Sequence, residues 1–226
     1  AVRKAVDNEV GAIIVEPIQG EGGINPAKKE FLQDLRAFCD KNSIVLIFDE
    51  IQCGVGRTGY WFAKDFYGVE PDIMTLAKAL GGGVPIGAIL SNEKVSEAMD
   101  YGDHGTTFGG NPLVCAAALA SLEVMEDENL LRKAREKGDW IREQVKAMNI
   151  PSIKEIRGLG LMIGIEFDFP TKDLMLEMFK RKVIVNATAG NVLRIVPPLN
   201  IKQDELDELI AVLKASIQQI SKEAKV

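Results

Sequence analysis

Cysteine and histidine are scarce in this chain, and their scarcity excludes several kinds of site. The three cysteines, Cys39, Cys53 and Cys115, are widely spaced, so they predict neither a disulfide framework nor a metal-ligand motif. Reduced thiols in a cytoplasmic protein are the simplest interpretation. The single histidine, His104, lies in a glycine-rich loop, where we expect a structural rather than a catalytic role.

Positive charge and long apolar stretches are also lacking. The formal net charge is −6 and no basic cluster stands out, which disfavours nucleic acid and anionic membranes as partners. No apolar stretch is long enough to span a bilayer, and no secretory signal opens the chain. The chain begins with Ala1 rather than Met and reaches an apolar segment almost at once. We therefore expect it to be either a processed chain or a piece of a longer one.

The first half of the chain alternates apolar runs with amphipathic segments. Short continuous apolar runs suit parallel strands that are covered on both faces, and a strand–helix–strand succession predicts a parallel pair. We expect strands at residues 11–15, 44–48, 71–76 and 86–91, and helices at residues 26–42 and 113–125.

The composition changes after about residue 126, where charged amphipathic segments begin. We expect helices at residues 129–148, 172–182 and 204–220, and strands at residues 153–156, 161–167, 183–185 and 193–196. The chain is therefore predicted to hold two parts. Residues 1–125 would belong to a large domain with a mainly parallel sheet, and residues 126–226 would form a smaller α/β domain.

Two residues follow predicted strands at the edge where ligands collect in open α/β sheets. Asp49 could serve chemistry there or form an ordinary turn. Lys78 lies between an apolar run and the glycines of residues 81–83. Burial of a lysine favours the neutral amine, which is a nucleophile toward aldehydes, but a surface lysine at a helix end fits the same pattern.

Two further features suit anions. Thr106 and Thr107 lie in a glycine-rich loop just before a predicted helix, where a phosphate could bind. Asn111 and Pro112 would cap and open that helix in either case. Arg194 lies in an apolar strand and needs a carboxylate, either from the protein or from a ligand. An amine, a carboxylate, hydroxyl groups and a guanidinium together match what pyridoxal phosphate requires.

Four motifs resemble the class III aminotransferases, which are fold-type I pyridoxal-phosphate enzymes of the α/β class. They are EPIQGEGG at residues 16–23, FDEIQCGVGRTG at 48–59, LAKALGGG at 76–83 and TTFGGNP at 106–112. The segment NATAGNVLRIVPPL at residues 186–199 is most similar to the acetylornithine aminotransferases of arginine biosynthesis.

The resemblance implies roles around the cofactor, with no metal ion. Lys78 would bond to the cofactor aldehyde and move a proton at the substrate Cα. Asp49 would pair with the ring nitrogen, and Thr107 would bind the phosphate of the partner subunit's cofactor in a homodimer. The cofactor-binding residues would be Asp49, Glu50, Ile51, Gln52, Lys78 and Thr107.

The resemblance also implies how substrates bind. Arg194 would clamp the α-carboxylate of glutamate or 2-oxoglutarate, Thr106 would lie near the substrate, and Glu21 would pair with Arg194 when the other substrate is present. The reaction would be a ping-pong transamination between N-acetylornithine and 2-oxoglutarate. Ornithine, succinylornithine and 4-aminobutyrate are alternative substrates. A non-catalytic α/β fragment that binds a phosphorylated ligand or a partner subunit is the alternative outside enzymes.

The sequence departs from the family pattern at its start. Family members carry an N-terminal half that supplies a phosphate loop and an aromatic ring stacked on the cofactor, and the glycine-rich segment at residues 54–59 is not that loop. We therefore expect this chain to be the C-terminal part of such an enzyme and to be catalytically incomplete alone.

Overall fold

The computed structural model describes residues 1–223 and contains two compact units, which are considered separately below. The first unit comprises Ala1–Pro17, Ala27–Val55 and Tyr60–Glu128, and the second comprises Ile18–Pro26, Gly56–Gly59 and the chain from Asn129 onward. The second unit thus takes in two earlier excursions of the chain, which a single division near residue 125 does not describe. Among residues 1–223, no helix is long and apolar enough to cross a membrane.

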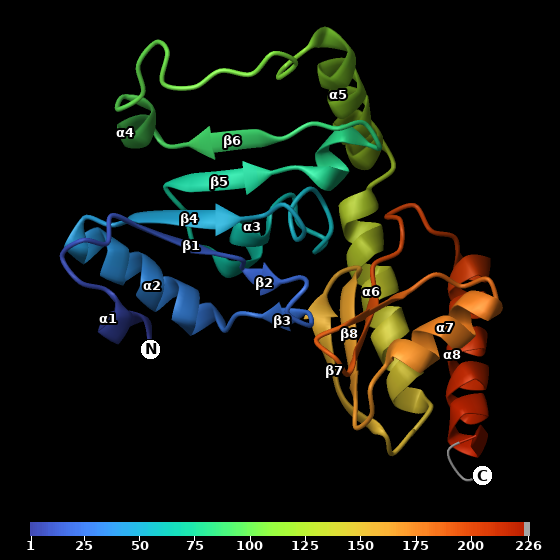
Figure 1. Cartoon of the computed structure of the whole chain (residues 1–226). Helices are drawn as coiled ribbons and strands as arrows, with labels where there is room; N and C mark the ends of the chain where they lie inside the picture. The colour runs from blue at the N-terminus through green and yellow to red at the C-terminus, as the bar shows by residue number, and fades with distance from the viewer. Residues whose placement is uncertain (224–226) are drawn as a thin grey trace. The chain divides into compact units, whose positions relative to one another are not determined.

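A four-stranded sheet forms the centre of the first unit (Figure 1). Its strands, in spatial order, are β1 (Ala12–Val15), β4 (Val45–Asp49), β5 (Ile73–Leu76) and β6 (Ala88–Ser91). The first three are parallel, and β6 runs antiparallel to β5. The predicted strand–helix–strand unit is confirmed, because α2 (Lys29–Asn42) connects β1 to its parallel neighbour β4.

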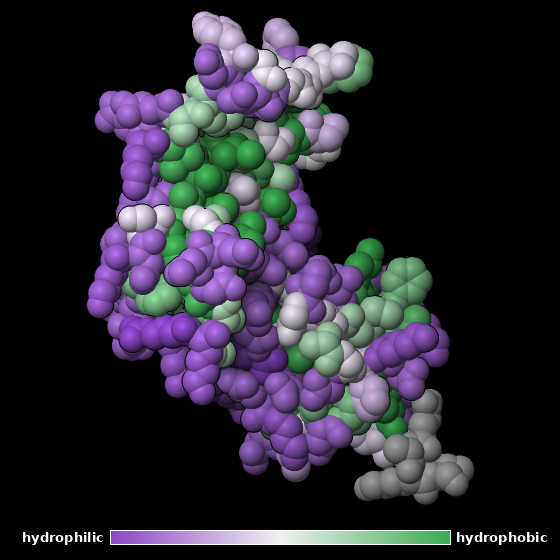
Figure 2. Space-filling model, turned by 60° about the vertical axis from the view of Figure 1, so that its left-hand side comes forward, coloured by the Kyte–Doolittle hydropathy of each residue, from purple (hydrophilic) through white to green (hydrophobic). Residues whose placement is uncertain are grey.

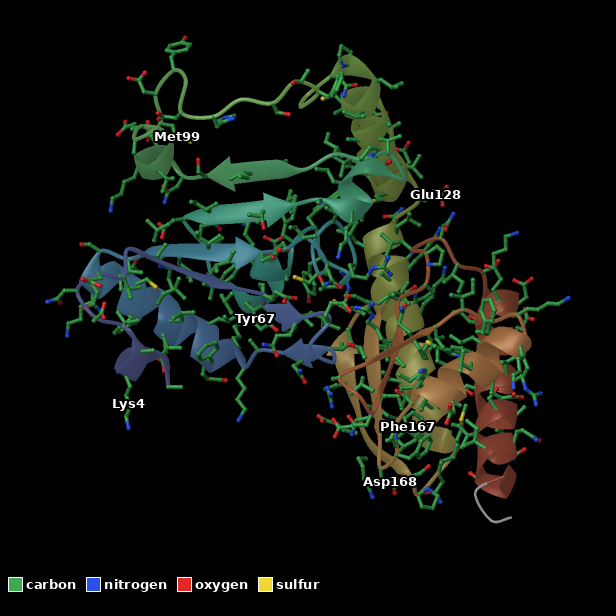
Figure 3. The ribbon with its side chains drawn as sticks, in the orientation of Figure 1. Lys4, Tyr67, Met99, Glu128, Phe167 and Asp168 are labelled. Atoms are coloured by element: carbon green, nitrogen blue, oxygen red, sulfur yellow. The ribbon has the colours of Figure 1, made fainter. Side chains whose placement is uncertain are left out.

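The first unit contains five α-helices and one 3-10 turn among the described residues. Their bounds are α1 (Val2–Ala5), α2, α3 (Ala63–Tyr67), the 3-10 turn η1 (Lys78–Gly81), α4 (Glu93–Ser96) and α5 (Pro112–Asp127). Leu32, Leu35 and Cys39 form the buried stripe of α2, which packs against β4. At the last residue of α3, the Tyr67 hydroxyl donates to the carbonyl of Pro17 at 3.1 Å (Figure 3).

An antiparallel sheet with helices on one side makes up most of the second unit (Figure 1). Its strands, in spatial order, are β7 (Ile153–Leu159), β8 (Met162–Phe167), β10 (Val192–Ile195) and β9 (Asn186–Thr188), and its helices are α6 (Leu130–Ala147), α7 (Lys172–Lys180) and α8 (Gln203–Glu223). The core is centred on β8, where Ile163, Ile165 and Phe167 are fully buried. Phe167 is the last residue of the strand and Asp168 follows it (Figure 3).

The segment at residues 16–23, whose proline and glycines are typical of a loop, contains a short strand. Strands β2 (Ile18–Gln19) and β3 (Asn25–Pro26) form an antiparallel ribbon, and β3 packs against β7. Ile24, at the turn of this ribbon, is fully buried, and its Cβ would lie 2.9 Å from a Cβ placed on Gly164 of β8. The ribbon is thus fixed to the sheet by an apolar contact for which a glycine leaves room.

The prediction of a strand at residues 183–185 is wrong. The amide of Val183 donates to the carbonyl of Met178 at 3.0 Å, so this residue closes the end of α7. Ile184 is 80 % exposed, and the strand β9 begins only at Asn186. The three apolar residues at 183–185 have a composition typical of a strand, but they lie in the connection between α7 and the more polar strand β9.

Large apolar side chains remain exposed on the first unit. On the two edge strands, Ile14 of β1 and Ile89 of β6 are 64 % and 73 % exposed. Phe108, in the loop before α5, and Leu113, in the first turn of α5, are 80 % and 75 % exposed. Figure 2 shows hydrophobic side chains gathered on the face of this unit that it presents. Apolar surface of this kind is typical of an interaction face.

Candidate functional site

Lys78 stands directly beyond the C-terminal end of β5, as the first residue of η1. Its backbone adopts the left-handed conformation with φ of 47°, which is uncommon for a lysine and is found at constrained positions. Its side chain is exposed, as in the alternative of a surface lysine at a helix end. The glycines at residues 81–83 carry no side chains that could cover it.

The turn that carries Lys78 lies close to α5. Gly82 has φ of 59°, and a Cβ at this position would come within 2.0 Å of the Ser121 hydroxyl oxygen. Only a glycine allows this approach with this backbone conformation. The glycine cluster therefore serves to dock η1 on α5, which fixes the backbone of Lys78.

Asp49 ends β4, the strand beside β5, and a threonine holds its carboxylate. Asp49 and Thr75 are register partners in the parallel pair. The Thr75 hydroxyl donates to Asp49 Oδ1 at 3.2 Å, and the amide of Ile51 donates to the same oxygen at 3.0 Å. Lys78 follows Thr75 by three residues, so the carboxylate and the amine leave neighbouring strands at the same edge of the sheet.

Sequence reasoning missed Thr75. A polar residue three positions before the lysine, inside an otherwise apolar strand, is the signal that could have found it. The two residues can pair only because β4 and β5 are adjacent and in this register, which no local pattern specifies.

Glu50 is the most deeply buried acid in the described chain, with 1 % of its surface exposed. Its two carboxylate oxygens accept the amides of Ala63 at 2.6 Å and Lys64 at 2.8 Å, at the first turn of α3. Burial raises the pKa of Glu50 to about 7, although the two backbone donors oppose this rise. The carboxylate thus anchors α3, and a direct role of Glu50 at the cofactor stays a prediction.

Ile51 and Gln52 follow in a turn and are half-buried. The turn folds back tightly, because the amide of Gly54 donates to the carbonyl of Glu50 at 2.8 Å. A Cβ on Gly54 would lie 2.7 Å from that carbonyl oxygen, so the position requires glycine. The predicted contacts of Ile51 and Gln52 with a cofactor stay predictions.

Thr106 and Thr107 lie in an exposed loop before α5. The amide of Gly109 donates to the Thr106 hydroxyl oxygen at 3.2 Å. Asn111 caps the helix, since its side-chain oxygen accepts the amide of Val114 at 3.2 Å, and Pro112 is the first helical residue. The predicted cap is confirmed, and the phosphate site at the threonines stays a prediction.

Arg194 has the carboxylate partner that its apolar strand requires. In the second unit, its Nη1 atom lies 2.6 Å from Glu21 Oε1. The Arg194 side chain is only 11 % exposed, whereas that of Glu21 is 70 % exposed. The guanidinium is therefore fixed inside the fold, and the acid that neutralises it approaches from the solvent side.

A second arginine of the same unit is held by carbonyl groups. Arg57 Nη1 donates to the carbonyls of Leu161 at 3.2 Å and Pro197 at 2.5 Å. Burial lowers the pKa of Arg57 to about 10. Residues 56–59 of the glycine-rich loop, with Arg57, thus belong to the second unit. This assignment was not predicted.

The described contacts form two clusters, one in each unit. Asp49, Thr75 and Glu50 belong to the first unit together with Lys78, whereas Glu21 and Arg194 form the cluster of the second. A fixed carboxylate and an amine at one sheet edge suit a cofactor with a basic ring nitrogen and an aldehyde. A guanidinium that is paired with an exposed carboxylate suits a substrate whose own carboxylate can take the place of that partner.

The model of the family described as "Aminotransferase class-III" matches residues 1–217. The chain belongs to this family. It is 50 % identical over 224 residues to the acetylornithine aminotransferase of Methanocaldococcus jannaschii, and this match covers 98 % of the chain and 56 % of the relative. It is 43 % identical to ornithine aminotransferase 1 of Staphylococcus saprophyticus, with 96 % of the chain and 56 % of that relative covered.

Solved structures of class III aminotransferases match as well. An ornithine aminotransferase from Toxoplasma gondii, with PLP at partial occupancy in its active site, superposes with a TM-score of 0.91 at 38 % identity. The match covers 97 % of the chain and 53 % of that structure. The predicted α/β class and the fold-type I assignment are thereby confirmed. The chain spans about half the length of the curated relatives that it matches.

Proposed function

We propose that the protein containing this chain is a pyridoxal-phosphate-dependent aminotransferase that transfers the ω-amino group of N-acetylornithine to 2-oxoglutarate. The observation that carries this proposal is the pairing of β4 with β5. It puts Asp49, held by the Thr75 hydroxyl at 3.2 Å, on the strand beside the one that leads to Lys78. The similarity to acetylornithine aminotransferases supports the choice of substrate and a role in arginine biosynthesis.

Bound pyridoxal phosphate would supply an electron sink for the electron pair that remains when the substrate loses a proton. Asp49 would accept a hydrogen bond from the protonated ring nitrogen through its carboxylate, which Thr75 and the amide of Ile51 orient. Lys78 Nζ would hold the cofactor at its aldehyde carbon, with loss of water. Once the amino group of the substrate displaces it, the released amine would move a proton between the substrate carbon that bears this group and the cofactor. Glu50, Ile51 and Gln52 would form the turn beside the ring.

Arg194 would recognise the α-carboxylate of 2-oxoglutarate or glutamate by a charge-assisted pair. In the other half of the reaction, the reacting end of N-acetylornithine is an amine on a carbon without a carboxylate. An unoccupied guanidinium with 11 % exposure would then be costly, and Glu21 would neutralise it. One recognition group would thereby serve two substrates of different charge, with Thr106 as a further contact.

We further propose that two copies of the protein form a homodimer in the cytoplasm, with Thr107 contributing to the phosphate site of the partner subunit. The neighbouring Phe108 is 80 % exposed and Leu113 is 75 % exposed, and such apolar side chains beside a polar loop favour an interface. Sedimentation of the holoenzyme and of a Phe108→Ser, Leu113→Ser variant would test this. Equal sedimentation of the two proteins would contradict it.

The test of the chemistry uses the enzyme loaded with pyridoxal phosphate. Borohydride should trap a covalent adduct on Lys78, and peptide mass analysis would locate it. Lys78→Ala should lose both the adduct and turnover, whereas Lys94→Ala, an exposed lysine of α4 in the same unit, should keep both. A chain that takes up no cofactor would favour a non-catalytic binding role instead.

Ornithine is the second candidate substrate, because a relative named ornithine aminotransferase 1 matches the chain at 43 % identity. A panel of N-acetylornithine, ornithine, succinylornithine and 4-aminobutyrate, each with 2-oxoglutarate, would separate the candidates by kcat/KM. The highest value for N-acetylornithine is expected. A higher value for any other amine would overturn the choice of substrate and leave the transamination in place.

A further inference from the structure

Arg157 of β7 holds the backbone of the loop that carries Glu21. Arg157 Nε donates to the carbonyls of Gly23 at 3.1 Å and Ile24 at 2.9 Å, and its Nη2 atom donates to Gly23 at 2.8 Å. One planar guanidinium thus donates hydrogen bonds to two neighbouring backbone carbonyls. A guanidinium offers this fork of donors in a fixed geometry, which an ammonium group does not.

Arg157 is itself fixed by acids of the same sheet. Its Nη1 atom lies 2.5 Å from Glu166 of β8 and 2.8 Å from Glu155 of β7. The side-chain amide of Asn191 donates to the carbonyl of Phe167 at 2.9 Å and lies 3.5 Å from Glu166. With 12 % of its side chain exposed, Arg157 is an element of the fold and not a free surface charge.

The other side of the loop is held by the last residue of β9 and contacted by the turn that follows it. The Thr188 hydroxyl donates to the backbone carbonyl of Glu21 itself. Gly23 has φ of 107°, and a Cβ at this position would lie 3.0 Å from the Cβ of Ala189 and 3.4 Å from Arg157 Nη2. The backbone on either side of Glu21 therefore has little room to move.

The side chain of Glu21 is largely exposed, in contrast to the backbone that Arg157 and Thr188 hold. It is 70 % exposed, while the Arg194 guanidinium that it meets is 11 % exposed. A fixed backbone under an exposed carboxylate leaves rotation of the side chain as the available movement.

We propose that Arg157 is a positioning residue for Glu21, which holds the backbone of residues 21–24 so that Glu21 uncovers Arg194 by side-chain rotation alone. This inference rests on the proposed function, because it concerns the two substrates that Arg194 and Glu21 would distinguish. Without the anchor, the loop shifts, and Glu21 competes less well for Arg194. A substrate carboxylate then binds Arg194 more tightly.

The decisive experiment is a double-mutant cycle in the holoenzyme, with the KM for 2-oxoglutarate as the readout. Arg157→Met is expected to lower this KM by about tenfold, a change typical of residues in one hydrogen-bond network. In a Glu21→Ala background the same substitution should change it by less than about twofold, because the competing carboxylate is already gone. Equal changes in the two backgrounds would overturn the proposal.

Two variants guard against a purely structural effect. Arg157→Lys retains the charge beside Glu166 but cannot span both carbonyls, so it should show a partial change. Thr188→Val removes the hydroxyl that holds the Glu21 carbonyl, and it should lower the KM in the same direction. A wild-type KM in both variants would contradict the anchoring role.

Arg142→Met is the matched control. Arg142 is 16 % exposed, donates to the carbonyl of Gly160 at 3.2 Å and pairs with Asp139, and both of these partners lie outside residues 20–24. It should leave the KM for 2-oxoglutarate unchanged. A change as large as that of Arg157→Met would mean that any lost arginine of this unit has the effect, and would overturn the proposal.

A readout without turnover is available from amide hydrogen exchange. The amides of Gly23 and Ile24 donate to the carbonyl of Gly20 at 3.3 and 3.4 Å, and Arg157→Met should speed their exchange while Arg142→Met should not. Unchanged exchange in both variants would contradict the anchor. If Glu21→Ala and Arg194→Ala each leave the KM for 2-oxoglutarate unchanged, the proposed function fails instead, and the exchange result still stands by itself.

Discussion

Replacing Glu50 by glutamine is expected to change how the stability of this chain depends on pH. Glu50 has a pKa of about 7 in the fold against 4.5 in the unfolded chain, because burial disfavours its charged form. Since its folded pKa is raised, Glu50 contributes most to stability below pH 4.5 and loses this contribution as the pH rises to about 7. The loss reaches about 3 kcal/mol, from about 1.4 kcal/mol for each tenfold change in proton affinity.

Glutamine at this position cannot ionise, so the difference in unfolding free energy between Glu50→Gln and the wild-type chain should move by about 3 kcal/mol in favour of the variant between about pH 4.5 and about pH 8. Urea titrations at several pH values in this range would measure it, with circular dichroism as the signal. Glu30→Gln is the matched control, because Glu30 is an exposed acid of α2 in the same unit. Parallel stability curves for the wild-type and Glu50→Gln chains would refute the reasoning.

Three other substitutions test the packing and the candidate site. Gly138→Ala should lower the free energy of unfolding by about 2 kcal/mol or more, because the new Cβ would lie 2.0 Å from the carbonyl oxygen of Gly160. The cost of this clash exceeds the gain of about 1 kcal/mol in helix propensity. An unchanged or higher melting temperature would contradict the prediction. Thr75→Val should weaken pyridoxal-phosphate binding by about tenfold, since the hydroxyl that holds Asp49 is lost; equal affinity in a spectroscopic titration would show that the bond is dispensable. Asn111→Ala should lower the free energy of unfolding by about 1 kcal/mol, because it removes the cap of α5. Urea unfolding would measure this, and a loss near zero would mean that the cap does not stabilise the fold.

Much of the first unit could be predicted because its strands are continuous apolar runs that end at polar residues. The runs before Asp49 and Lys78 correctly indicated parallel strands and placed both residues at strand ends. The sequence left both burial and exposure of Lys78 open, because the choice depends on which side chains surround η1 in three dimensions. The buried position of Glu50 is likewise a consequence of how α3 returns to the end of β4.

The second unit shows why contacts that are distant in the sequence escape a local pattern. The sequence indicated that Arg194 needs a carboxylate, but only the resemblance pointed to Glu21, which lies 173 residues away. The ribbon of β2 and β3 has two residues in each strand, too few for a periodic pattern. Conversely, three apolar residues at 183–185 were enough to suggest a strand where a connection occurs.

The excursion of Ile18–Pro26 into the second unit limits how this protein can be cut or recombined. A chimaera joined at Asn129 would take Arg194 from one parent and Glu21 from the other, and likewise Arg157 and the carbonyls that it holds. Exchange of the substrate-recognising unit between two relatives therefore requires residues 18–26 and 56–59 to travel with it. Natural or designed variants that change only the C-terminal segment are expected to keep the fold but to separate the guanidinium from its matched acid.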